Sequence, residues 1–186
     1  MKSKTLSHKA LFLDRDGIIN VDHGYVSKIE SFEFNEGIFE FLHLFIKEGY
    51  KVFIVTNQSG IGRGYYSQND FETLTTWMLA EFKKQNIAIE SVHYCNHAPE
   101  EKCACRKPAT GMIDEILSLH NIDLKHSWMV GDKQSDIDLA HNAGIFFTIA
   151  IGERPIENAF FSFESILKAK GFFAKNNLLS SLLANN

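Results

Sequence analysis

The chain has 186 residues, of which 45% are hydrophobic and 23% charged, and its formal net charge is -4. This length supports one domain with a sizeable core but not comfortably two, so we expect a single domain over residues 1–186. The composition is that of an ordinary soluble globular protein. The acidic balance argues against a protein that coats nucleic acid, because such a protein needs a strongly basic surface to neutralise phosphates.

We expect neither a leader nor a membrane span in this sequence. The first apolar stretch, residues 10–13, stops at Asp14, whereas a secretory signal needs at least about 7 apolar residues there. No apolar run approaches the roughly 18 residues of a membrane span. We therefore expect a cytoplasmic protein without a membrane partner.

Short apolar runs alternate with helical patterns along the chain. Runs that end abruptly in Gly or polar residues are typical of strands buried on both faces. Such strands are expected at residues 10–13, 51–55, 127–130 and 145–151, with another near 89–94. Helical spacing predicts helices near 38–46, 67–82, 113–119 and 137–140, and the tail at 160–186 is expected to form one or two more on the sheet's flank. The alternation predicts a parallel α/β sheet with right-handed crossovers.

Polar side chains follow three of these strands directly. Asp14 and Asp16 come after the first strand, Thr56 and Asn57 after the second, and Asp132 after the third. Since such sheets bind ligands at the carboxyl ends of their strands, we expect these groups to converge. Each cluster taken singly could be a solvated turn or a helix cap.

In this order the motifs resemble the haloacid dehalogenase superfamily of phosphohydrolases. The four motifs are Asp14-Arg15-Asp16-Gly17, Thr56-Asn57, Lys107, and Gly131-Asp132 with Asp136. The segments "DRDGIINVDHGYV", "VTNQSGIGRGYY", "CRKP" and "MVGDKQSDIDLAHNAGI" look like the D-glycero-D-manno-heptose 1,7-bisphosphate phosphatases, which are related to histidinol phosphatase. The resemblance runs from about residue 11 to residue 151.

The resemblance implies a Rossmann-like, three-layer fold built around the parallel sheet. Many members of the superfamily cover the site with an inserted cap domain, typically of about 50 residues or more. The intervals after Asp16 and after Thr56 are too short for one, so we expect a capless enzyme with an open site. Selectivity would then come from loops.

The resemblance also implies the chemistry, which is hydrolysis of the 7-phosphate of the heptose bisphosphate. Asp14 would attack phosphorus and form an aspartyl phosphate, and Asp16 would act as general acid and base. Mg²⁺ would bind Asp14, the Asp16 backbone carbonyl and Asp132. Thr56 and Lys107 would hold phosphate oxygens.

Asp136 is expected to support the metal ligands rather than to bind the metal. The reaction would serve the route to nucleotide-activated heptose for lipopolysaccharide core or surface polysaccharide.

The same family pattern assigns the substrate contacts. They are Asp22, His23, Gly24, Tyr25, Thr56, Asn57, Gln58, Ser59, Arg106, Lys107 and Lys133. Arg106 could grip the phosphate that is not cleaved, because a guanidinium binds such groups in a bidentate manner. His23 and Tyr25 could instead belong to a packed loop.

All three cysteines lie in one short segment, residues 95–105. Cys95, His97, Cys103 and Cys105 offer the four ligands of a closed tetrahedral zinc site. Their spacing matches the metal loop of the resembling family, in which zinc is structural. We expect zinc to order this loop and so to fix the segment that carries Arg106 and Lys107; free surface thiols are the alternative.

Three rival functions stay open at this point. Histidinol-phosphate phosphatase shares the four motifs and the metal loop. A DNA 3′-phosphatase is disfavoured because the chain lacks a basic stripe. A zinc-containing binding module would leave Asp14, Asp16 and Asp132 crowded without purpose. We expect a monomer that acts on a small phosphorylated sugar, without nucleic acid as a partner, and the motifs favour neither anomer.

Overall fold

The computed structural model describes residues 7–176 and residue 179. Its centre is a six-stranded sheet in the order β3-β2-β1-β4-β5-β6, with every neighbouring pair parallel. The strands are β1 (Ala10–Leu13), β2 (Lys51–Asn57), β3 (Ile89–Cys95), β4 (Trp128–Gly131), β5 (Phe147–Ile151) and β6 (Phe161–Phe163). The predicted parallel α/β fold is therefore confirmed.

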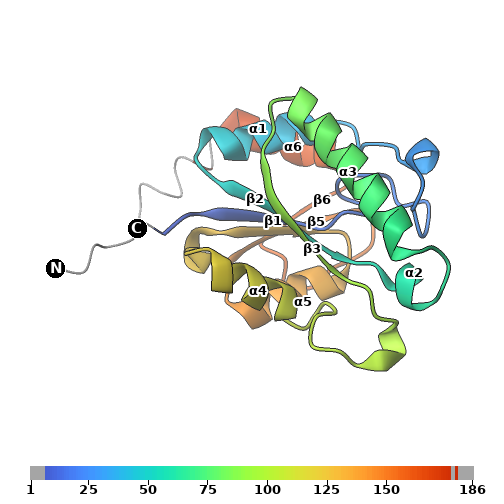
Figure 1. The fold of residues 1–186 in the computed structure, drawn as a ribbon. Coiled ribbons are helices and arrows are strands. Elements are labelled where there is room, and N and C mark those ends of the chain that lie inside the picture. Colours follow the sequence, from blue (N-terminus) through green and yellow to red (C-terminus); the bar gives the residue numbers. More distant parts are fainter. Residues whose placement is uncertain (1–6, 177–178, 180–186) are drawn as a thin grey trace.

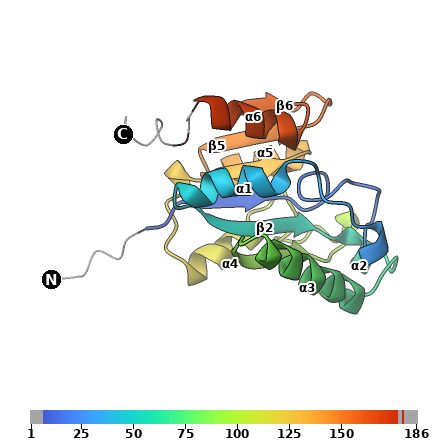
Figure 2. The same cartoon turned by 90° about the horizontal axis from the view of Figure 1, so that it is seen from above.

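Helices cover both faces of the sheet and make a three-layer structure (Figure 1). The helices are α1 (Ile38–Lys47), α2 (Ser59–Gly62), α3 (Gln68–Lys84), α4 (Gly111–Leu119), α5 (Gln134–Ala143) and α6 (Ile166–Asn176), with short 3-10 turns η1 (Ile29–Ser31), η2 (Pro99–Glu101) and η3 (Leu124–His126). Helices α1, α3 and α6 lie on one face, and α4 and α5 lie on the other. Figure 2 shows α1 and α6 side by side above the sheet.

Each face has its own apolar core, because all four side chains of β1 are fully buried and they alternate between the two faces. Leu11 and Leu13 pack with the apolar faces of α1, α3 and α6, whereas Ala10 and Phe12 pack with those of α4 and α5. A strand buried on both faces has no room for polar side chains. The first polar residue of this segment, Asp14, consequently lies directly after the end of the strand.

The tail contains a strand as well as the expected helix on the sheet's flank. Residues 161–163 form strand β6, which pairs with β5 in parallel, and α6 follows as a helix. The Phe-Ser-Phe alternation places Phe161 and Phe163 together against Phe172, which suits the two-residue period of a strand. Residues 177, 178 and 180–186 of the expected tail lie outside the described residues.

No domain is inserted between β1 and α1 or between β2 and β3. The first interval holds only loop and η1, and the second holds α2 and α3. Neither interval therefore supplies a domain that could cover the carboxyl ends of β1, β2 and β4. None of the helices described is long and apolar enough to cross a lipid bilayer.

Candidate active site

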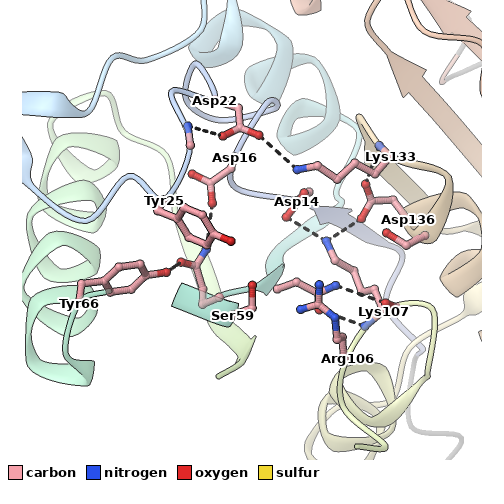
Figure 3. A pocket seen from close by; sticks show the side chains of 14 residues that line it. Asp14, Asp16, Asp22, Tyr25, Ser59, Tyr66, Arg106, Lys107, Lys133 and Asp136 are labelled. Carbon is pink, nitrogen blue, oxygen red and sulfur yellow. Dashed lines mark hydrogen bonds and ion pairs between the residues drawn. The ribbon is translucent and has the colours of Figure 1, made fainter. Parts of the chain in front are cut away.

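A cavity of about 360 Å³ opens at the carboxyl ends of the central strands. Figure 3 shows acidic groups on its upper side and Lys107 and Arg106 below. Its lining consists of Asp14, Asp16, Asp22, Gly24, Tyr25, Asn57, Gln58, Ser59, Tyr66, Arg106, Lys107, Lys133, Ser135 and Asp136. The structure thus brings together most of the residues that the sequence motifs selected, from segments more than 100 positions apart.

Lys107 lies at the floor of this cavity between two carboxylates. Its side chain is only 2% exposed, and its Nζ is 2.9 Å from Asp14 Oδ1 and 2.6 Å from Asp136 Oδ1. The ammonium group donates a hydrogen bond to the Val55 carbonyl, 2.9 Å away. Burial by itself would lower the pKa of Lys107, but Asp136 and Asp14 outweigh it and raise the pKa. The ammonium therefore stays charged beside Asp14.

Asp14 keeps one oxygen free of protein donors. Its Oδ1 accepts from the backbone N–H of Arg15 at 2.8 Å and forms an ion pair with Lys107 Nζ. Oδ2 has no such donor in the described part of the chain. The carboxylate is 6% exposed and faces the cavity, so it combines an open oxygen with an adjacent fixed cation.

Asp132 lies beside Asp14 and Asp136, with ligand atoms of the three carboxylates within 4.8 Å of one another. It is not among the residues that line the 360 Å³ cavity; with Gly17 it lines a neighbouring cavity of about 570 Å³. Gly17 has a φ of +90°, and a Cβ there would lie 2.5 Å from the Asp132 carboxyl carbon. Glycine is therefore required at position 17 for Asp132 to approach Asp14 this closely.

The three clustered carboxylates favour a cation. Burial, then the nearby Asp14, raise the pKa of Asp132 to about 7, against the opposing effect of Lys133. The Oδ1 atom of Asp132 is buried and has no hydrogen-bond donor within the described residues. A hard, oxygen-only donor set is what Mg²⁺ selects, so these residues fit such an ion. Asp136 is already paired with Lys107.

Asp16 is held by several donors at once. Its Oδ1 accepts from the Arg15 guanidinium at 3.0 to 3.2 Å and from Asn20 Nδ2 at 3.0 Å. Its Oδ2 accepts from Arg15 Nη2 at 3.0 Å and from Gln58 Nε2 at 2.9 Å. Arg15 is 1% exposed and also donates to the Val26 carbonyl, so the guanidinium that holds Asp16 is itself anchored in the protein.

The residues of the second motif have distinct positions. Thr56 is 1% exposed and lies behind the cavity, where its hydroxyl oxygen accepts from Gln58 Nε2 at 2.9 Å. Asn57 lines the cavity, but its amide binds the Lys107 backbone on both sides. Its Oδ1 accepts from Lys107 N at 3.0 Å and its Nδ2 donates to Lys107 O at 3.3 Å. Asn57 therefore positions the segment that carries Lys107.

The rim of the cavity is built by the loop at residues 22–25 and by Lys133. Lys133 Nζ lies 3.3 Å from Asp22 and 3.6 Å from Asp132. Gly24 and Tyr25 both have positive φ, and Gly24 N donates to Asp22. This turn directs Tyr25 to the cavity, whereas His23 does not line it: its ring is half exposed and 3.4 Å from Glu33.

Arg106 lines the same cavity beside Lys107. Its Nη1 atom is buried and has no partner among the described residues. Ser59 lies across the cavity at the start of α2. An unpaired guanidinium nitrogen at a cavity wall is suited to an anionic ligand.

Two lining residues were missed from the sequence. Ser135 lines the cavity at the start of α5. Tyr66 donates its hydroxyl proton to Gln58 Oε1 at 2.6 Å. Tyr66 belongs to the segment "VTNQSGIGRGYY", so the sequence places it near a site motif. Residue spacing does not predict its hydrogen bond to Gln58.

Cys95, His97, Cys103 and Cys105 form a second cluster, with one ligand atom from each within 4.8 Å of the others. The sulfur–sulfur distances run from 2.7 to 3.5 Å, somewhat less than the ~3.8 Å that Zn–S bonds of ~2.3 Å give in a tetrahedron. His97 Nδ1 is 3.2 Å from Cys105 Sγ. A small outward movement of the sulfurs would fit a zinc ion.

Comparison with known proteins identifies the family. The HAD-hydrolase-like family model matches residues 104–149. The D-glycero-beta-D-manno-heptose-1,7-bisphosphate 7-phosphatase of Helicobacter pylori is 47% identical over 152 residues, which is 81% of this chain and 88% of that protein. The D-glycero-alpha-D-manno-heptose-1,7-bisphosphate 7-phosphatase of Campylobacter jejuni is 45% identical over 171 residues, which is 91% of this chain and 98% of that protein.

A solved structure agrees with these relatives at the level of the fold. The D,D-heptose 1,7-bisphosphate phosphatase from B. bronchiseptica, complexed with magnesium and phosphate, superposes with a TM-score of 0.78 at 24% identity, covering 90% of this chain and 98% of that one. The expected family is therefore confirmed. The chain belongs to the heptose bisphosphate phosphatases of the haloacid dehalogenase superfamily.

Proposed function

We propose that this chain hydrolyses the 7-phosphate of D-glycero-D-manno-heptose 1,7-bisphosphate and so serves the synthesis of nucleotide-activated heptose for surface polysaccharide. The observation that carries the proposal is the pairing of Asp14 with the buried Lys107 at the floor of an open cavity that also presents Asp16. The 45 to 47% sequence identity to heptose-1,7-bisphosphate 7-phosphatases supports the choice of substrate.

In the proposed reaction, a carboxylate oxygen of Asp14 attacks phosphorus while the bond from phosphorus to the C7 oxygen breaks. Asp16 gives its proton to the departing sugar oxygen, which leaves as the alcohol. Asp16 then takes a proton from water, whose oxygen attacks phosphorus and releases inorganic phosphate. Asp14 returns to its carboxylate form, so both residues end the cycle unchanged.

Lys107 holds positive charge beside the attacking carboxylate throughout the cycle. Its ammonium group forms ion pairs with Asp14 and Asp136 and donates a hydrogen bond to the Val55 carbonyl, so protein groups alone hold it beside Asp14. A preorganised cation in a buried site stabilises developing charge without having to reorient. The Thr56 hydroxyl oxygen accepts from Gln58, and in the proposed reaction its proton is donated to a phosphate oxygen.

Mg²⁺ would be held by the carboxylates of Asp14 and Asp132, with the Asp16 backbone carbonyl as a further ligand. When bound, it neutralises negative charge on the phosphate and so lowers the barrier to attack by an anion. Asp136 keeps Lys107 in place rather than binding the metal, in line with their 2.6 Å contact.

Zinc would be held by Cys95, His97, Cys103 and Cys105 as a structural ion. Four protein ligands leave no open coordination position, so the ion would not activate water. The loop from 95 to 105 contains only one short 3-10 turn and is mostly polar and exposed at its tip. A metal would order it in place of a core.

The test is a phosphate-release assay over both anomers of the heptose bisphosphate, with histidinol phosphate as the competing substrate. We expect Mg²⁺-dependent turnover of a heptose bisphosphate and loss of at least about 10⁴-fold in Asp14→Asn, since loss of a nucleophile costs far more than one decade. Preference for histidinol phosphate would replace the substrate assignment. Asp14→Asn activity within about tenfold of wild type would exclude Asp14 as the nucleophile.

A further inference from the structure

We propose that Tyr66, acting through Gln58, is a positioning residue for Asp16 and Thr56. Neither residue need touch the substrate for this role. The Tyr66 hydroxyl fixes the direction of the Gln58 side-chain amide, and the amide nitrogen in turn orients the groups of the first two motifs. The inference deepens the proposed function and rests on Asp16 being the acid and base of that reaction.

Gln58 connects the two motifs by hydrogen bonds from one atom. Its Nε2 donates to Asp16 Oδ2 at 2.9 Å and to Thr56 Oγ1 at 2.9 Å. Its Oε1 accepts from the Tyr66 hydroxyl at 2.6 Å. Because the Gln58 side chain is 2% exposed, water does not readily replace any of these partners.

The direction of the amide decides whether this arrangement works. An ionised carboxylate can only accept hydrogen bonds, so Asp16 requires the NH₂ end of Gln58. The reversed amide would place Oε1 against the Asp16 carboxylate and remove both donated bonds. Tyr66 favours the productive direction because its hydroxyl donates to the oxygen end. Burial, which is the largest effect, raises the pKa of Tyr66 to about 12, so its proton is retained at neutral pH.

The chain holds Tyr66 firmly in this position. The next residue, Ser67, caps α3: its hydroxyl accepts from Asp70 N at 3.1 Å, and Asp70 accepts from Ser67 N at 2.8 Å. The Tyr66 ring packs directly over Gly60, where a Cβ would lie 2.1 Å from ring atom Cε1. The N-cap of α3 at Ser67 and the packing of the ring on Gly60 therefore fix the position of the Tyr66 hydroxyl.

Orientation of Asp16 matters in proportion to how much the leaving group needs its proton. A sugar alkoxide is a poor leaving group, so the proton must reach the ester oxygen as the bond to phosphorus breaks. A nitrophenolate departs with little protonation. Loss of the Tyr66 hydroxyl should therefore slow sugar phosphates strongly and nitrophenyl phosphate weakly.

The experiment compares Tyr66→Phe with wild type on heptose bisphosphate, phenyl phosphate and p-nitrophenyl phosphate. We expect kcat on heptose bisphosphate to fall about tenfold, which is part of the 10² to 10⁴ that acid–base catalysis supplies. The loss on p-nitrophenyl phosphate should be at least about five times smaller, with phenyl phosphate in between. Tyr94→Phe is the matched control, because the Tyr94 ring packs on Phe71 from β3, away from the cavity.

A second variant tests whether Tyr66 affects Asp16 through the side-chain amide of Gln58. Gln58→Leu should show the same leaving-group dependence, and adding Tyr66→Phe to it should cost less than about twofold more, since both changes break one chain of contacts. Equal losses on all three substrates, additive losses in the double variant, or a raised KM for the sugar with unchanged kcat would each overturn the proposal. If wild type turns over the two aryl phosphates but not heptose bisphosphate, the proposed substrate fails while the aryl pair still tests Tyr66.

Discussion

Replacing Asp132 with asparagine should stabilise the protein when magnesium is absent. Burial and the carboxylates of Asp14 and Asp136 raise the pKa of Asp132 from its ordinary value of 3.8 to about 7. The folded state therefore holds a proton on Asp132 more tightly than the unfolded state does. The stability linked to this proton is fully present below about pH 4 and is lost as the pH rises through about 7.

The size of the effect follows from the shift. About three pKa units at 1.36 kcal/mol each give an upper value of about 4 kcal/mol at pH 8. Partial relaxation around a carboxylate that is 11% exposed reduces this to about 2–4 kcal/mol. For a chain of this size that corresponds to a rise in Tm of roughly 4–16 °C. The advantage of Asp132→Asn should fall to less than half by pH 5, because wild-type Asp132 is protonated there in the folded state.

Thermal unfolding at pH 8 and pH 5, with and without Mg²⁺, is the assay. The protein should be moved into magnesium-free buffer by gel filtration without a chelator, so that the cysteine cluster is not disturbed. Millimolar Mg²⁺ should raise the Tm of wild type and leave Asp132→Asn nearly unchanged, because only wild type presents the full set of ligands. Asp114→Asn, at an exposed position on α4, is the matched control and should change little.

Two results would refute this reasoning. If Asp132→Asn is less stable than wild type at pH 8 without magnesium, the crowded carboxylate is not a source of strain. If the difference between the two proteins is the same at pH 5 and pH 8, it does not come from the ionisation of Asp132. Either result would remove the energetic argument that a cation binds at this carboxylate cluster.

Two further substitutions test the cavity wall and the cysteine cluster. Arg106→Ala should weaken turnover of the bisphosphate more than that of a monophosphate, by about 1.5–3 kcal/mol in kcat/KM, because a charged hydrogen-bonding partner is lost; equal losses on both substrates would place Arg106 at the cleaved phosphate or in the scaffold. Cys103→Ala should lower the zinc content from about one ion per chain, raise KM and lower kcat together, and leave the far-UV circular dichroism nearly unchanged. Fully active wild-type protein without zinc in elemental analysis would contradict a structural metal there.

The sheet and the convergence of the motifs could be predicted because both depend on local chemistry. A strand that is buried on both faces has to be apolar throughout, so β1 is visible as a run of four apolar residues. The first polar residue after it, Asp14, has to lie at the sheet edge, where neighbouring parallel strands end as well. Topology alone then brings Asp132 from β4 to the same place.

Other features depend on packing that spacing does not reveal. The Phe-Ser-Phe segment became β6 because β5 offers it a free edge, and the same residues could have covered a helix face. His23 stands within a site motif, yet the turn through Gly24 leaves it beside Glu33 and outside the cavity. The hydrogen bond from Tyr66 to Gln58 requires the Tyr66 ring to pack over Gly60, and residue spacing does not reveal that contact.

The loop at residues 95–105 contacts the site on two sides. Its role is therefore wider than positioning Arg106 and Lys107. On one side, the Cys95 carbonyl accepts from Gln58 N and the Asn96 carbonyl accepts from Gly62 N, each at 2.8 Å. On the other, Gly111 N donates to Ala104 O at 3.0 Å, next to the segment that carries Lys107.

The loop thus lies between the backbone that presents Gln58 and the backbone that presents Lys107. If it loosens, the clamp on Asp16 and the cation beside Asp14 should be weakened together. This is why a change at a cysteine that touches no substrate is expected to alter kcat as well as KM.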